Sequence, residues 1–188
     1  MTRAAFLDRD GVINEKAPEG AYITRWEDLK FLPGVVEAIT RLNHSGWQVI
    51  VISNQRCVAK GLISIPELEA LHQRMSQWLA DRGAVIDAVY YCPHEKTQPP
   101  CTCRKPEPGM LLRAAREHQI DLAASWMIGD SESDMEAGRR AGCNRLRIQP
   151  RQNPKPASDS CASSLLDAVI RIGLKTVVEP DKTAANKR

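Results

Sequence analysis

Four short apolar runs, each closed by a polar residue, constrain the fold of this chain more than any other feature. The runs span residues 3–7, 47–52, 85–91 and 126–128. A nearly continuous apolar run of this length is typical of a strand that is buried on both faces of a parallel sheet. The polar residues that close the runs are Asp8, Ser53, Cys92 and Asp130. A fainter run over residues 145–148 predicts an edge strand.

Helical patterns lie between the apolar runs. Leu68, Leu71 and Met75 repeat every three or four residues, and Ser64 with Glu67 fits a capping box at the start of that helix. Other predicted helices begin near residue 35 or cover residues 110–118, 135–141 and 164–172, and residues 149–160 form a polar loop. The alternation predicts an α/β fold: a three-layer α/β/α, Rossmann-like arrangement with a mostly parallel sheet.

Length and composition indicate one globular domain. The chain has 188 residues, of which 43% are hydrophobic and 26% charged. We assign residues 1–175 to the domain and expect a flexible tail over residues 176–188. No apolar run is long enough to span a membrane, and no signal-peptide pattern opens the chain, so we expect a cytoplasmic monomer without a membrane partner. A net charge of +3 and 5% aromatic residues do not favour a nucleic-acid partner.

The first apolar run ends in two carboxylates, Asp8 and Asp10, which stand one residue apart. A surface turn would explain this fragment taken alone, because Asp-Gly is common in turns. In an open parallel sheet, however, binding sites gather beyond the carboxyl ends of the strands, where Asp130 is also expected. Carboxylate oxygens are ligands that suit Mg²⁺, and Mg²⁺ relieves repulsion between acids and an anionic substrate. The pattern therefore favours a magnesium site.

Ser53, Lys105 and Asp134 add groups that a phosphoryl-transfer site needs. Each has a common structural explanation when taken alone: a turn or cap serine, a solvated loop lysine and a capped helix start. Together with the acids, Lys105 can neutralise phosphoryl charge and Ser53 can donate a hydrogen bond to it. A carboxylate can also act as a nucleophile through an aspartyl-phosphate. The set therefore predicts a site that binds and transfers a phosphoryl group.

A loop rich in cysteine predicts a second metal. It contains Cys92, His94, Cys101 and Cys103 in the pattern C-x-H…C-x-C. Four thiolate and imidazole ligands suit tetrahedral Zn²⁺, and because they leave no position for water the site should be structural. The loop ends at Arg104 and Lys105, so zinc is expected to position these two side chains. Cys57, Cys143 and Cys161 are expected to be packed or bystander thiols.

The motifs DRDG, SNQ, the loop lysine and GDSESD together resemble the haloacid dehalogenase superfamily of phosphohydrolases over about residues 3–148. The resemblance implies that Asp8 is the nucleophile and that Asp10 is the general acid and then the base. It implies Mg²⁺ ligation by Asp8, by Asp130 and by Asp10 through its backbone carbonyl. Ser53 and Lys105 are implied as phosphoryl stabilisers, so that the implied catalytic residues are Asp8, Asp10, Ser53 and Lys105. Asp134 would orient the metal shell.

Within that superfamily, LDRDGVIN, CPH and CTCRKPEPGM are similar to the heptose-1,7-bisphosphate 7-phosphatases. This resemblance implies a small phosphorylated sugar as partner, removal of its 7-phosphate and no large cap domain. It implies substrate contacts by Glu19, Gly20, Ala21, Tyr22, Asn54, Gln55, Arg56 and Arg104. The chain departs from the family pattern at Arg56 and Cys57, which stand where small residues are usual, and at Ser131, where many members have lysine.

Other functions remain open from the sequence, among them hydrolysis of another small sugar phosphate. Histidinol-phosphate phosphatases share the acid pair and the zinc loop, although Asn14 and the PEPGM segment favour the sugar phosphatase. A phosphotransferase is chemically allowed, because an aspartyl-phosphate can be passed to an alcohol. A zinc-stabilised binding module without catalysis would have no need for both acids together with Lys105 and Asp130.

Overall fold

The computed structural model describes residues 1–95, 101–149 and 161–173. The expected tail over residues 176–188 lies outside the described residues, as do residues 150–160 of the predicted polar loop. In the described part of the chain, no helix is long and apolar enough to cross a membrane.

The core of the molecule is one parallel sheet of six strands in the order β3-β2-β1-β4-β5-β6. β1 lies inside the sheet between β2 and β4, and all four of its residues are buried. The strands are β1 (Ala4–Leu7), β2 (Gln48–Asn54), β3 (Ala88–Cys92), β4 (Trp126–Gly129), β5 (Asn144–Ile148) and β6 (Cys161–Ala162). The predicted α/β class with a parallel sheet is confirmed.

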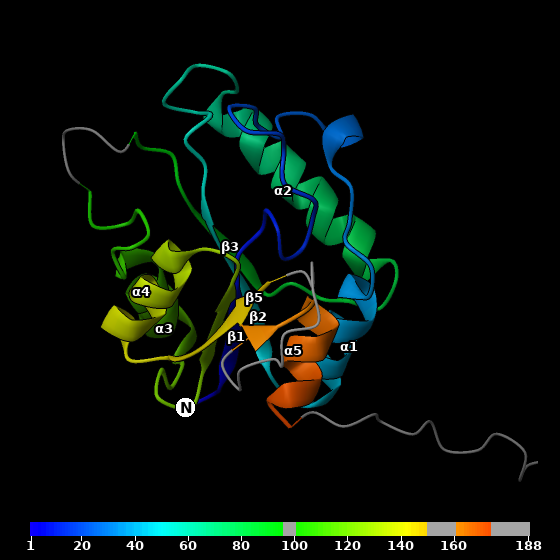
Figure 1. The fold of residues 1–188 in the computed structure, drawn as a ribbon, viewed down its shortest axis with the longest axis vertical. Helices are drawn as coiled ribbons and strands as arrows, with labels where there is room; N and C mark the ends of the chain where they lie inside the picture. The colour runs from blue at the N-terminus through cyan, green and yellow to red at the C-terminus, as the bar shows by residue number, and fades with distance from the viewer. Residues whose placement is uncertain (96–100, 150–160, 174–188) are drawn as a thin grey trace, which may run out of the picture.

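Helices cover both faces of this sheet (Figure 1). One face packs against α1 (Val35–His44), α2 (Ile65–Ala80) and α5 (Leu165–Arg171), and the other against α3 (Gly109–His118) and α4 (Glu132–Ala141). The two cores follow the alternation of side chains along a strand, because Ala5 and Leu7 of β1 belong to the first core and Phe6 to the second. The three-layer arrangement is therefore confirmed. A short 3₁₀ helix, η1 (Trp26–Asp28), precedes α1.

The helix starts show how side chains set the element boundaries. The capping box predicted for α2 is present, because the Ser64 amide donates to Glu67 Oε2 at 2.8 Å and Ser64 Oγ accepts from the Glu67 amide. α4 begins at Glu132, three residues before the predicted start, because Ser131 and Asp134 form a second capping box.

Two strand predictions needed correction. β3 begins at Ala88 and not at Val85, because Val85 is exposed and its amide donates to Asn43 on α1. Asp87 Oδ2 accepts from the Val49 amide at 2.7 Å and the Asp87 amide donates to the Val49 carbonyl at 2.9 Å, so a side-chain acceptor takes part in the contact with β2 just before β3 begins. β5 was predicted as an edge strand, but it lies between β4 and β6. The edge position belongs to β6, which was not predicted because two residues carry no recognisable pattern.

Candidate active site

The polar residues that end the apolar runs meet at one edge of the sheet. Asp8 follows β1, Ser53 lies in the last part of β2, Cys92 ends β3 and Asp130 follows β4. These four strands are neighbours and all run in the same direction, so their carboxyl ends share an edge. The predicted convergence of the strand ends is confirmed.

Lys105 reaches this edge from the loop before α3 and is almost fully buried, with 3% of its surface exposed. Its ammonium lies 2.8 Å from Asp8 Oδ1 and 2.6 Å from Asp134 Oδ1, and it donates to the Ile52 carbonyl at 2.7 Å. Asn54 holds the lysine's backbone in two ways, because Asn54 Oδ1 accepts from the Lys105 amide and Asn54 Nδ2 donates to the Lys105 carbonyl. Lys105 and Asn54, which are far apart in the sequence, are therefore held together by several hydrogen bonds.

The charges around Lys105 are coupled. Burial raises the pKa of Asp8 to about 7, although the Lys105 ammonium opposes this rise. Burial also disfavours the charge of Lys105, but the carboxylates of Asp8 and Asp134 outweigh it and raise the lysine's pKa. Burial opposes the charge of Asp134 too, yet Lys105 and the Ser131 hydrogen bonds lower its pKa. Asp134 therefore holds the lysine in its charged form.

Three carboxylates form a cluster that fits a hard divalent cation. Asp8, Asp130 and Asp134 each offer an oxygen, and these oxygens lie within 4.8 Å of one another. Asp130 Oδ1 is buried without a hydrogen-bond partner, while Asp130 Oδ2 lies 2.5 Å from the Lys16 ammonium. A buried, unpaired carboxylate oxygen is costly unless a cation meets it. The donor set is therefore suited to Mg²⁺.

Gly11 makes room for this carboxylate cluster. Its φ angle is +91°, a conformation that favours glycine, and a Cβ at this position would overlap the Asp130 carboxylate. The glycine of the DRDG motif is therefore needed both for the turn after β1 and for the close approach of Asp130.

Asp10 lies in a different environment from Asp8. Its carboxylate accepts from Arg9 Nη2 at 3.0 Å on both oxygens, from Arg9 Nε at 3.2 Å and from Asn14 Nδ2 at 2.8 Å. Gln55 Nε2 donates to Asp10 Oδ2 at 3.3 Å and to Ser53 Oγ at 2.7 Å. The side chain of Asp10 is therefore not part of the three-carboxylate cluster. Metal ligation by the backbone carbonyl of Asp10 stays a prediction.

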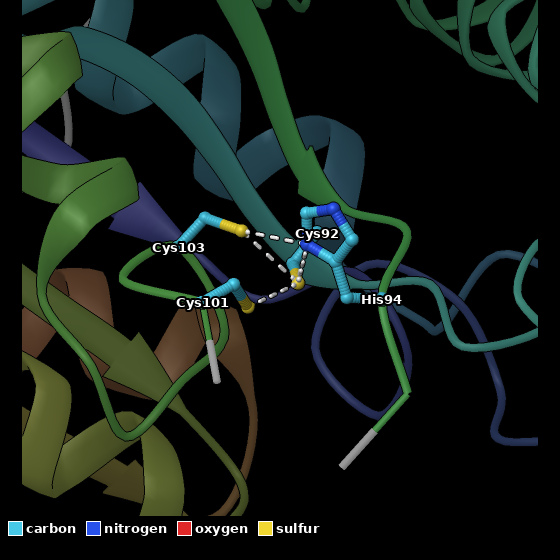
Figure 2. Close-up of side chains that lie close together, drawn as sticks. All are labelled: Cys92, His94, Cys101 and Cys103. Carbon is cyan, nitrogen blue, oxygen red and sulfur yellow. Dashed lines mark hydrogen bonds between the residues drawn. The ribbon is translucent and has the colours of Figure 1, made fainter. Parts of the chain in front are cut away.

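The cysteine loop forms a second cluster next to Lys105. Figure 2 shows three sulfur atoms and the imidazole of His94 gathered around one point. The separations are 3.5 Å for Cys92 Sγ to His94 Nδ1, 3.6 Å for Cys92 Sγ to Cys101 Sγ, and 3.2 Å from Cys103 Sγ to both His94 Nδ1 and Cys92 Sγ. Tetrahedral zinc with bonds of about 2.3 Å needs donors about 3.8 Å apart. The cluster fits zinc after a small expansion.

Four of the predicted substrate contacts lie on the segment 19–22, beside a cavity. Glu19, Gly20 and Ala21 are exposed, and Tyr22 packs against the small apolar cluster around Cys57. Ala21 and Tyr22 line a cavity of about 370 Å³ together with Lys16. Substrate binding by the segment 19–22 stays a prediction.

Four other predicted substrate residues already have partners within the chain. Asn54 binds the Lys105 backbone, and Gln55 is 3% exposed with its amide on Ser53 and Asp10. Arg56 pairs with Glu95 at 2.5 Å, and Arg104 Nη1 donates to the His94 carbonyl at 3.0 Å. The geometry gives Asn54 and Gln55 a role in positioning, because their side-chain amides are directed at the catalytic candidates.

Sequence reasoning missed three side chains of the site: Arg9, His72 and Lys16. Arg9 is 1% exposed, and its Nη1 lies 3.1 Å from His72 Nε2 on α2. A signal for His72 was present, because this histidine falls on the apolar face that Leu68 and Met75 define. No sequence pattern marked Lys16.

Comparison with known proteins adds independent information. Residues 102–149 match the family profile described as HAD-hydrolase-like. The chain is 44% identical over 157 residues to a D-glycero-D-manno-heptose-1,7-bisphosphate 7-phosphatase from Thermosynechococcus vestitus. This match covers 78% of this chain and 78% of the relative. It is 35% identical over 173 residues to the D-glycero-beta-D-manno-heptose-1,7-bisphosphate 7-phosphatase of Escherichia coli K12, covering 88% of this chain and 89% of the relative.

A solved structure agrees with these relatives. The D,D-heptose 1,7-bisphosphate phosphatase of B. bronchiseptica, complexed with magnesium and phosphate, superposes with a TM-score of 0.81 and 34% identity. The match covers 91% of this chain and 98% of that one.

Proposed function

The chain belongs to the heptose-1,7-bisphosphate 7-phosphatases, a family of phosphoric monoester hydrolases with the haloacid dehalogenase fold, and we propose that it removes the 7-phosphate of D-glycero-D-manno-heptose 1,7-bisphosphate. The observation that carries the catalytic part of this proposal is the contact of Lys105 with Asp8 beside Asp130. The substrate is proposed because the similar phosphatases are named for heptose 1,7-bisphosphate.

Asp8 is the nucleophile in this proposal. One of its carboxylate oxygens attacks phosphorus, and the bond from phosphorus to the sugar oxygen breaks, which leaves an aspartyl-phosphate. Lys105 stabilises the negative charge of the transferring phosphoryl group, and the Ser53 hydroxyl donates a hydrogen bond to it. Asp134 supports the lysine from its far side, since its carboxylate lies 2.6 Å from the ammonium.

Asp10 moves the proton in both steps. It donates a proton to the leaving sugar oxygen, and it then takes a proton from the water that attacks the aspartyl-phosphate. The second step releases inorganic phosphate and restores the Asp8 carboxylate and the Asp10 acid. The position of Asp10 outside the three-carboxylate cluster supports this assignment, because its carboxyl oxygens are then not needed as metal ligands.

Asp8 and Asp130, with the Asp10 backbone carbonyl, would hold Mg²⁺, for which the buried unpaired oxygen of Asp130 is the structural argument. When bound, Mg²⁺ supplies charge that offsets the repulsion between these carboxylates and the phosphate. Lys16 pairs with Asp130 Oδ2, so the unpaired Oδ1 is the oxygen of Asp130 that remains for the ion.

We propose a single structural zinc ion at Cys92, His94, Cys101 and Cys103. Four protein donors complete a tetrahedral shell, so this ion would serve the fold of the loop and not the reaction. Because Cys103 stands two residues before Lys105, the ordered loop would fix the approach of the catalytic lysine to Asp8.

The substrate assignment is tested with purified protein in Mg²⁺ against heptose bisphosphate, fructose bisphosphate and histidinol phosphate. We expect the largest kcat/KM for the heptose bisphosphate, with inorganic phosphate and the heptose 1-phosphate as products. A larger kcat/KM for histidinol phosphate would overturn the sugar assignment and leave the phosphatase mechanism in place. Transfer of the phosphate to an added alcohol in preference to water would instead identify a phosphotransferase.

A further inference from the structure

We propose that His72 is a positioning residue for the general acid, and that it acts through Arg9. Both side chains are buried, with exposures of 4% for His72 and 1% for Arg9, and the two are in contact at 3.1 Å. Arg9 in turn holds both oxygens of Asp10. The inference rests on the proposed function, since it gives a role to these residues only if Asp10 carries the proton.

The chemistry of the contact defines the state of His72. A guanidinium has only donors, so His72 Nε2 must accept the hydrogen bond from Arg9 Nη1. The imidazole is therefore neutral, with its proton on Nδ1. Burial and the neighbouring Arg9 charge agree with this, because they lower the pKa of His72 to about 3.

His72 thereby fixes the direction of the guanidinium plane. Its contact occupies Nη1, and the remaining donors Nε and Nη2 are then directed at Asp10. An arginine has several rotatable bonds, and a buried guanidinium with one unmade hydrogen bond would shift toward another acceptor. Helix α2 is therefore joined to the general acid by a rigid chain of two hydrogen-bonded contacts.

The contacts from His72 to Arg9 and from Arg9 to Asp10 control the orientation of the Asp10 carboxyl group. Its Oδ1 accepts from Arg9 and Asn14, and its Oδ2 accepts from Arg9 and Gln55. A carboxyl group that donates to the leaving oxygen must present a defined oxygen, and a displacement of about 1 Å can cost about 10²-fold in rate. Loss of the His72 contact should therefore weaken proton donation and not the attack by Asp8.

A buried histidine on an apolar helix face often serves packing alone, and the test must separate that role from positioning. Leaving-group chemistry provides the separation. An alkoxide leaving from a sugar phosphate needs a proton, whereas a nitrophenolate leaving from p-nitrophenyl phosphate does not. Because the later attack of water on the aspartyl-phosphate is common to both substrates, the comparison uses kcat/KM, which covers the reaction only up to release of the leaving group. A positioning defect lowers kcat/KM for the sugar phosphate selectively, whereas a general loss of folded protein lowers both values.

The experiment compares His72→Leu, which keeps the volume and removes the acceptor, with His72→Gln, whose amide oxygen can accept from Arg9. For His72→Leu we expect kcat/KM for the sugar phosphate to fall about 10- to 50-fold and kcat/KM for p-nitrophenyl phosphate to fall less than about 3-fold. For His72→Gln we expect both values within about 3-fold of the parent protein. Asp10→Asn gives the reference for complete loss of the acid.

Leu79→Ala is the stability control, because Leu79 is a buried residue two turns along α2. It should lower Tm and change both rates equally. If His72→Leu does not fold, Arg9→Lys replaces it in the test. Lysine keeps the positive charge but lacks the planar set of guanidinium N–H donors, so the same selective loss of activity on the sugar phosphate is expected.

Equal loss of both reactions in His72→Leu, or loss of neither, would overturn the positioning role. If Asp10→Asn itself lowers kcat/KM equally for both substrates, the proposed acid role of Asp10 is wrong, and the positioning of that acid falls with it. A selective loss in Asp10→Asn without one in His72→Leu or Arg9→Lys would leave the proposed function intact and refute this inference alone.

Discussion

The two clusters at the carboxyl edge of the sheet differ in the type of donor atom that they offer. The acid cluster of Asp8, Asp130 and Asp134 consists of hard oxygen donors at strand ends and on α4, with the ammonium groups of two lysines in contact. The thiol cluster of Cys92, His94, Cys101 and Cys103 lies at the end of β3 and in the loop before α3, and its donors contact one another.

The difference indicates what each cluster is for. The acid cluster combines carboxylates that suit a cation with the Lys105 ammonium, which suits an incoming phosphoryl group, as a reaction requires. Four mutually facing soft donors leave no position for a reactant, which is the arrangement of a structural site. Lys105 joins the two regions, because it leaves the loop of the thiol cluster and ends on the acid cluster.

The largest expected effect comes from Asp8→Asn. An amide is not a nucleophile toward phosphorus, so kcat should fall by about 10³-fold or more. The thiol cluster does not include Asp8, and elemental analysis should still find one zinc per chain. Asp81→Asn, an exposed change at the C-cap of α2, is the matched control and should behave like the parent. Near-normal turnover in Asp8→Asn would contradict the mechanism, and loss of zinc would contradict the independence of the two clusters.

A smaller effect on turnover is expected from Cys101→Ser, together with loss of zinc. Removal of one thiolate should lower the zinc content, decrease Tm and reduce kcat about 10- to 100-fold, since the loop that carries Lys105 would lose its support. Cys161→Ser changes a partly buried cysteine outside the cluster and serves as the control. Full zinc content in Cys101→Ser, or equal zinc loss in Cys161→Ser, would show that the ligand set is wrong.

The smallest effect is a pH dependence confined to the acid cluster. Since burial raises the pKa of Asp8 to about 7, this carboxyl holds a proton at lower pH in the metal-free protein. Mg²⁺ must displace that proton, so its affinity should fall about tenfold, or about 1.4 kcal/mol, for each pH unit below about 7 and level off above it. Calorimetric titration between pH 5.5 and 8.5 measures this slope. An affinity independent of pH over that range would disagree with a protonated Asp8.

The sequence predicted those parts of the fold and site that depend on short patterns. Buried apolar runs located β1, β2 and β4, because strands covered on both faces carry little else, and parallel ends then placed Asp8 and Asp130 together. The close spacing of Cys92 with His94 and of Cys101 with Cys103 predicted the thiol cluster, which the structure brings within 4.8 Å.

Other features could not be predicted because they depend on tertiary contacts. Arg9 would be expected at the surface, and its burial follows from the partners Asp10 and His72 that only folding brings together. The contact of Lys16 with Asp130 depends on the conformation of one long side chain. Gln55 was predicted to meet the substrate, and its burial between Ser53 and Asp10 is set by the turn after β2.

The backbone and ammonium of Lys105 are held by Asn54, Asp8, Asp134 and the Ile52 carbonyl before any ligand arrives. A free lysine side chain loses about 2 kcal/mol of rotamer entropy when it is immobilised. Under the proposed mechanism, that loss occurs during folding and not when Lys105 meets the phosphate of the substrate. The cation is thus preorganised, and reorganisation of this side chain adds little to the activation barrier.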